Sequence, residues 1–106
     1  MGAKLVRDRI EELPWRAEQE KKYLRLVTST EEHIRLLRQK ILEKLGELFS
    51  AESPLKAAEE AADVMEAMAV YLSLLGVEDT DVVNLIRDKK YDERGGFQIG
   101  VVYEGQ

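Results

Sequence analysis

The chain has 106 residues, of which 44% are hydrophobic and 35% charged, with a formal net charge of −5, no cysteine and a single histidine, His33. These totals exclude disulfides, cysteine-ligated zinc and any multi-histidine metal site within one chain. The acidic balance argues against a nucleic-acid polymer as partner, and no apolar run approaches the roughly 18 residues of a membrane span, so we expect one cytoplasmic domain over residues 1–106.

The N-terminal segment shows only weak structural signals. Residues 4–10 are short and charged, and Pro14 bounds any helix that starts in them, which predicts an extended or single-turn arm. Residues 15–22 are mostly polar and fit a loop or a weak helix.

A long amphipathic helix is predicted next, running to about Phe49. Its start is a capping box, in which Ser29 accepts from the backbone of Glu32 while the Glu32 side chain reaches back. Apolar residues recur at three- and four-residue spacing along it: Ile34, Leu37, Ile41, Leu45 and Leu48.

A second helix is predicted from Ser53 to Gly76. Ser53 suits the N-cap, Pro54 suits the first helical position and Gly76 suits the C-cap. Its continuous apolar stretch over residues 67–75 predicts the central, most buried helix of the protein.

The C-terminal third predicts one more helix and an irregular tail. The helix starts near Asp79 or Thr80 and stops at Gly95. It is expected to bury its apolar residues, Val82, Val83, Leu85 and Ile86. Residues 97–103 predict a short strand or an extended arm.

Acidic residues interrupt the otherwise alanine-rich second helix. Glu59 and Glu60 each lie one turn from Asp63, so like charges share one face. The preceding helix carries Glu43 and Glu47, and a short connection would bring the two acidic segments together. Two interpretations remain open: a solvated acidic face, or a shared cation such as Mg²⁺ or Mn²⁺, which prefer oxygen ligands.

Four segments, in order, resemble the all-α nucleoside triphosphate pyrophosphohydrolases, in the MazG-like and phosphoribosyl-ATP pyrophosphohydrolase-like group. The arm Lys4 to Ile10 looks like the Lys-Leu-Val-Arg-Asp-Lys-Ile start of a small single-domain branch, and Lys40 to Glu47 resembles its first acidic helix. Glu60 to Asp63 resembles the E-x-x-D half of its metal motif, and Lys90 with Arg94 to Phe97 resembles its closing segment.

The resemblance implies an all-α antiparallel helix bundle with extended N- and C-terminal arms, completed by assembly into a homodimer or homotetramer. It also implies Mg²⁺-dependent (or Mn²⁺-dependent) hydrolysis of a nucleoside triphosphate to the monophosphate and pyrophosphate, in a house-cleaning role. No nucleic-acid polymer or membrane is expected as a partner.

The implied site divides into three groups of residues. The metal ligands would be Glu47, Glu60, Asp63 and Glu59, and the catalytic acids Glu43 and Glu47. Lys90, Arg94, Gly95 and Arg7 would grip phosphate. Residues 90–95 equally fit a helix C-terminus with basic residues that complement its dipole, and Arg7 equally fits an ion pair that ties down the arm.

One position departs from the family pattern. The first half-motif is E-x-x-E, and Lys44 stands three residues before Glu47 where the pattern has an acid. The lysine could supply counter-charge in place of a metal, swing outward, or mark a non-catalytic nucleotide- or metal-binding relative. A structural oligomerisation domain, based on the apolar second helix, is the remaining alternative.

Overall fold

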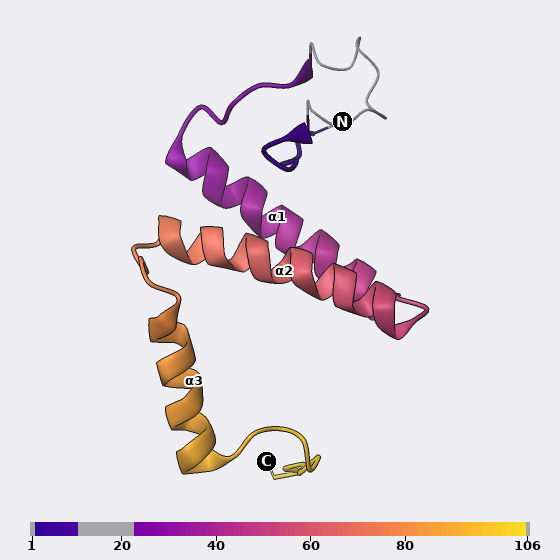
Figure 1. The fold of residues 1–106 in the computed structure, drawn as a ribbon, viewed down its shortest axis with the longest axis vertical. Helices are drawn as coiled ribbons and strands as arrows, with labels where there is room; N and C mark the ends of the chain where they lie inside the picture. Colours follow the sequence, from indigo (N-terminus) through magenta and orange to yellow (C-terminus); the bar gives the residue numbers. More distant parts are fainter. Residues whose placement is uncertain (1, 11–22, 106) are drawn as a thin grey trace. The chain divides into compact units, whose positions relative to one another are not determined.

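The computed structural model describes residues 2–10 and 23–105 and is helical throughout its regular parts (Figure 1). The helices are α1 (Thr30–Phe49), α2 (Pro54–Leu74) and α3 (Asp81–Arg94), and no strand occurs in the described residues. The all-α prediction is therefore confirmed. The expectations for Trp15 and the rest of residues 15–22 lie outside the described residues.

Local capping signals explain where α1 and α2 begin. The Ser29 hydroxyl accepts from the Glu32 N–H at 3.1 Å, and the Ser53 hydroxyl accepts from the Lys56 N–H at 3.1 Å. Both caps were predicted. The second half of the capping box differs, because Glu32 accepts from the Thr28 N–H at 2.9 Å rather than from that of Ser29. Arg25 binds both carboxylate oxygens of Glu32, at 2.9 and 2.7 Å, and this contact favours the shifted position.

Glycines follow the ends of α2 and α3 as predicted. The last turn of α2 is closed by Leu75 as C-cap, and Gly76 follows with φ +101°. Gly95 caps α3 with φ +76°. Glycine enters this left-handed region without the steric cost of a β-carbon.

The chain divides into two compact units, Met1–Gly76 and Val77–Gln106. In the first unit the chain reverses between α1 and α2, which pack against each other along their length (Figure 1). The predicted stripe of α1 faces this contact: Leu37 is buried, and Ile34, Ile41, Leu45 and Leu48 are partly buried. The N-terminal arm forms a single turn in which the Ile10 N–H donates to the Arg7 carbonyl, and Ile10 is buried.

The burial predicted for α3 is wrong, and that predicted for α2 is realised only in part. The described residues bury only four apolar side chains, Ile10, Leu36, Leu37 and Ala67. The apolar stretch of α2 is covered in part: Ala67 is buried, whereas Met68 is 40% and Leu75 52% exposed, because α1 shields one stripe of the helix. In the second unit, Val82, Val83, Leu85 and Ile86 are all exposed, since α3 has no packed neighbour within its unit.

The C-terminal residues 97–103 form an extended arm without a strand. None of the helices in the described ranges combines the length and the apolar character that crossing a membrane requires.

Candidate functional site

The candidate site is a cluster of charges between the end of α1 and the first half of α2. Helix α1 contributes Lys44 and Glu47, and α2 contributes Glu60 and Asp63. The turn at residues 50–53 returns the chain along α1, so residues far from the turn in α1 meet residues far from it in α2. The structure thus brings together three of the predicted ligands, Glu47, Glu60 and Asp63.

The Lys44 ammonium lies among these three carboxylates. Its Nζ is 3.0 Å from Glu47 Oε2, 3.2 Å from Asp63 Oδ2 and 3.6 Å from Glu60 Oε2. The side chain of Lys44 is 21% exposed. The position that departs from the family pattern therefore supplies a cation at the centre of the acidic cluster.

Glu60 is the only buried charged residue in the described ranges, with 5% of its surface exposed. Its Oε1 lies 3.3 Å from the Lys56 Nζ, one helical turn earlier. Its Oε2 is buried and has no hydrogen-bond partner. A buried oxygen without a partner costs free energy that a close cation would recover.

Charge pairing determines the protonation of the cluster. The pKa of Glu47 lies below its usual range, and the Lys44 ammonium, which donates to the Glu47 carboxylate, contributes to that shift. Burial acts to raise the pKa of Asp63, but hydrogen bonds from Arg7 and Lys44 outweigh it, and the net shift is downward. The pKa of Lys44 is raised, chiefly by its hydrogen bond to Glu47, against the opposing effect of burial. Lys44, Glu47 and Asp63 are therefore all charged at neutral pH.

Arg7 reaches the cluster from the N-terminal arm. Its guanidinium donates to Asp63 Oδ1, on the opposite carboxylate oxygen from Lys44. This is the contact expected of an ion pair that ties down the arm. It also places a second cation against the acidic site.

The other two predicted acids lie beside the cluster. Glu43 pairs with Lys40 at 3.4 Å, within α1. Glu59 pairs with Lys56 at 3.7 Å, within α2, and its side chain is 58% exposed. Both pair with a lysine three residues away on their own helix, and neither is an ion-pair partner of Lys44.

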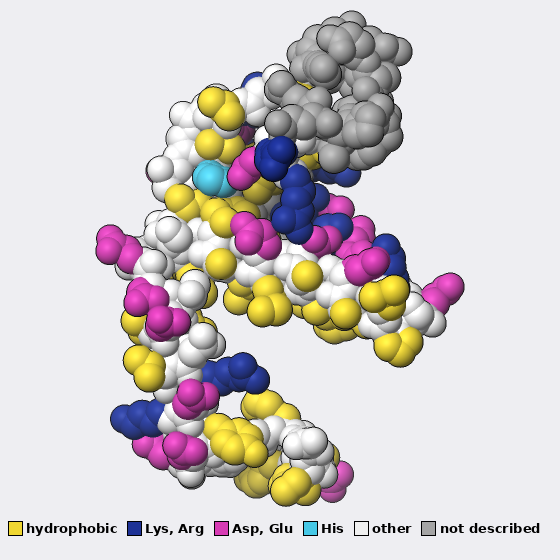
Figure 2. All heavy atoms as spheres, viewed as in Figure 1, with side chains coloured by type: hydrophobic (Ala, Val, Ile, Leu, Met, Phe, Trp, Pro, Cys, Tyr) yellow, Lys and Arg dark blue, Asp and Glu magenta, His cyan; other side chains and the backbone are white. Residues whose placement is uncertain are grey.

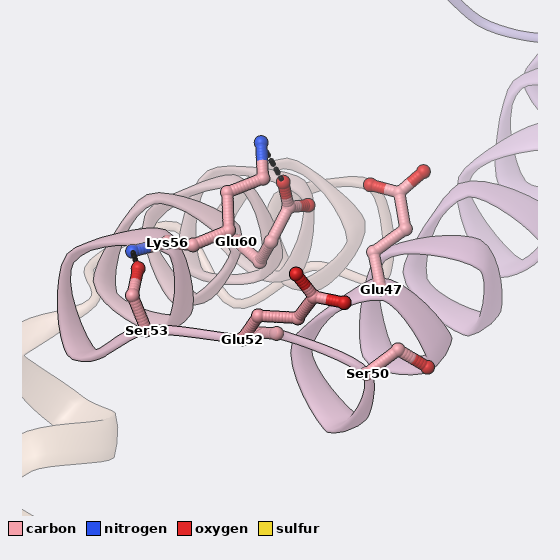
Figure 3. Close-up of a pocket in the computed structure, with 7 residues that line it drawn as sticks. Glu47, Ser50, Glu52, Ser53, Lys56 and Glu60 are labelled. Atoms are coloured by element: carbon pink, nitrogen blue, oxygen red, sulfur yellow. Dashed lines mark hydrogen bonds and ion pairs between the residues drawn. The ribbon is translucent and has the colours of Figure 1, made fainter.

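A hollow that the sequence did not predict lies at the α1–α2 turn, next to the cluster. Figure 3 shows the polar residues that line it: Glu47, Ser50, Glu52, Ser53, Lys56 and Glu60. Lys56 could have been found from its four-residue spacing to Glu60, which places both on one face of α2. Glu52 could not have been found in this way, because it lies in the turn between the two helices, where no regular spacing relates it to Glu60.

The predicted phosphate-gripping residues Lys90, Arg94 and Gly95 belong to the second unit. Arg94 ends α3, and the Gly95 N–H donates to the Tyr91 carbonyl at 2.7 Å. The local structure is thus the capped helix C-terminus that was one of the two interpretations, with a basic residue in the last turn.

The donor set fits a hard divalent cation by its chemistry. The three carboxylates offer oxygens from two facing helices, and Glu60 Oε2 lacks a hydrogen-bond partner. Across residues 2–10 and 23–105, however, no three acidic or imidazole groups converge closely enough to hold a metal as they stand. The cationic group that these three carboxylates share in the structure is the ammonium of Lys44.

Searches of protein-family models, of curated proteins and of solved structures find no match to this chain.

Proposed function

We propose that the protein is a Mg²⁺-dependent nucleoside triphosphate pyrophosphohydrolase that acts in the cytoplasm and resembles the MazG-like enzymes. One observation carries the proposal: Glu47, Glu60 and Asp63, from two facing helices, all pair with the same ammonium, that of Lys44. The E-x-x-D spacing of Glu60 and Asp63 and the order of the four similar segments support it further.

Each residue has a defined part in this proposal. Glu47, Glu60 and Asp63 would hold the divalent ion, and Glu59, the residue before Glu60 on α2, would be a further ligand. When bound, Mg²⁺ would neutralise charge on phosphate oxygens and lower the pKa of a water molecule. Glu43 or Glu47 would orient the water. A lowered pKa makes Glu47 a weak base, so it is better suited to accepting a hydrogen bond than to taking a proton.

The net reaction adds water across the phosphoanhydride between the α- and β-phosphates and needs no nucleophile from the protein. Pyrophosphate leaves, and the proton of the water is released. Lys90 and Arg94 offer two cations that suit binding of phosphate oxygens, and Gly95, which has no side chain, would let the backbone approach the phosphate. Arg7 would contribute to phosphate binding after leaving Asp63.

The decisive assay measures pyrophosphate release from a panel of nucleoside triphosphates with Mg²⁺ or Mn²⁺. We expect turnover by the wild type and a loss of about 100-fold or more in Asp63→Asn and Glu60→Gln, since charge stabilisation at the phosphate is removed. Glu66→Gln, one turn beyond Asp63 on α2 and exposed, is the matched control and should keep its rate. Circular dichroism verifies that each variant is folded. Absence of turnover with every nucleotide would refute the enzymatic proposal.

A second candidate is a non-catalytic nucleotide- or metal-binding relative, favoured by the position of Lys44 among the carboxylates. In that case nucleotide raises the melting temperature without being hydrolysed, and Lys44→Glu, which recreates the E-x-x-E spacing, gains activity. Detectable hydrolysis by the wild type would eliminate this candidate.

We also propose that the helical pair completes an antiparallel bundle by assembly with further copies. Hydrophobic side chains run along the edge of α2 (Figure 2). Leu42 of α1 and Met68 of α2 are exposed and line a mostly apolar groove, together with Ile41, Tyr71 and Arg38. The same face of a second copy of the chain would pack against this groove and cover both helices. The resulting assembly would be a homodimer or a homotetramer.

A further inference from the structure

Lys44 differs from the other lysines of the helical pair in what it contacts. Its ammonium pairs with an acid of its own helix, Glu47, and with two acids of α2, Glu60 and Asp63. Without a cation between them, these carboxylates would repel one another across the helix contact. Lys44 therefore joins α1 to α2 at the point where their like charges meet.

The oxygens that Lys44 contacts are the same ones that a divalent ion would require. An ammonium on a four-carbon stem and a free divalent ion therefore compete for one position. The ammonium is held at a high effective concentration because it is tethered. Its hydrogen bonds go to Glu47 and Asp63, whereas buried Glu60 Oε2, at 3.6 Å, remains without a hydrogen-bond partner. Lys44 therefore leaves one buried carboxylate oxygen without a hydrogen bond. A cation that lay closer to this oxygen would stabilise it further.

The geometry also allows the exchange. The Lys44 side chain is 21% exposed, and long lysine stems move their charged head into water at little cost. Figure 2 shows acidic and basic side chains intermixed along the visible face of the helical pair.

From these contacts we propose that Lys44 is a tethered counter-ion, which holds the metal-free site together and is displaced when a divalent cation binds to Glu47, Glu60 and Asp63. The inference rests on the metal site of the proposed function, but it does not require turnover. It defines Lys44 as the residue that sets the metal affinity of the site.

Calorimetric titration with Mn²⁺ tests the proposal on the wild type, Lys44→Met and Lys40→Met. Lys40 is the matched control because it lies one turn earlier on α1, is 18% exposed, and pairs with Glu43 of its own helix. We expect Lys44→Met to bind Mn²⁺ about tenfold or more tightly than the wild type, since one unit charge no longer competes. Lys40→Met should bind much as the wild type does. Equal or weaker binding by Lys44→Met would overturn the proposal.

A second measurement uses the wild type alone and so does not depend on folding of the variant. Acylation of lysines by an amine-reactive ester, followed by mass spectrometry, reports how accessible each ammonium is. Mn²⁺ should raise the acylation rate of Lys44 several-fold relative to Lys40. An unchanged or lower rate while Mn²⁺ is bound would refute displacement.

The outcomes separate this inference from the proposed function. If Mn²⁺ binds but Lys44→Met has no effect, the inference fails and the enzymatic proposal stands. If Lys44→Met gains affinity but no nucleotide is hydrolysed, the inference stands and the enzymatic proposal fails. If neither the wild type nor Lys44→Met binds Mn²⁺, the proposed metal site does not exist. Both the enzymatic proposal and the inference about Lys44 then fail.

Discussion

Single charged residues define this protein more than its apolar core does. Glu60 is a buried carboxylate with lysines on either side, and Asp63 accepts from both Arg7 and Lys44. Removing one member of such a network leaves its partner uncompensated, so the expected effect exceeds that of an ordinary surface ion pair. Comparing Lys44→Met with Lys40→Met separates the effect of a lysine in the network from that of a lysine that pairs only within its own helix.

Glu32 gives a prediction for acid conditions. Hydrogen bonds from Arg25 and from the Thr28 backbone lower its pKa from 4.5 to about 2. A folded-state pKa below the unfolded value means that the stabilisation is present above about pH 4.5 and is lost as the pH falls towards 2. The stability difference between wild type and Glu32→Gln should therefore shrink over that interval.

Urea unfolding of both proteins at several pH values measures this difference. Glu31→Gln is the control, because Glu31 is an exposed acid in the same helical turn. A difference between wild type and Glu32→Gln that stays constant down to about pH 2 would contradict the assignment.

The turn between α1 and α2 determines which residues of the two helices meet. Ser53 caps the start of α2 through its hydroxyl, and Pro54 follows at the first turn. At the C-cap of α1 the backbone N–H groups act instead: that of Ser50 donates to the Gly46 carbonyl and that of Ala51 to the Leu48 carbonyl. The side chain therefore matters at Ser53 and not at Ser50.

Ser53→Ala should lower the free energy of unfolding by about 1 kcal/mol, because the Lys56 N–H loses its acceptor. Ser50→Ala keeps the backbone bonds of its cap and should leave stability almost unchanged. Denaturant unfolding of the two variants provides the measurement. Similar losses in both would show that the Ser53 hydroxyl is not what stabilises the start of α2.

At the scale of the whole molecule, the proposed assembly can be tested, because few apolar side chains are buried within the described residues. Met68→Glu places a charge in the apolar groove between α1 and α2 and should convert a homo-oligomer into monomer, as measured by light scattering after gel filtration. Leu26→Glu is the control, since Leu26 is 88% exposed and lies outside the groove. A wild type that is monomeric at every concentration would contradict the proposed bundle.

Features that depend on neighbouring residues were predictable from the sequence. The N-caps at Ser29 and Ser53 and the glycines after α2 and α3 were predicted because capping and left-handed conformations are satisfied within a few residues. The proximity of Glu47 to Glu60 and Asp63 also followed, because a short connection forces neighbouring helices together.

Burial and charge pairing were not predictable in the same way. Val82 and Leu85 have an apolar pattern that indicates a buried face, yet they are exposed, because a pattern does not specify whether a neighbour covers it. Likewise, the acid pattern left open whether Lys44 turns outward or inward. The sequence alone therefore established the helices and the acids they carry, through local backbone and periodicity rules. The packing of α1 on α2 decided that Lys44 lies between those acids, because the distance between opposite charges on two helices depends on how the helices meet.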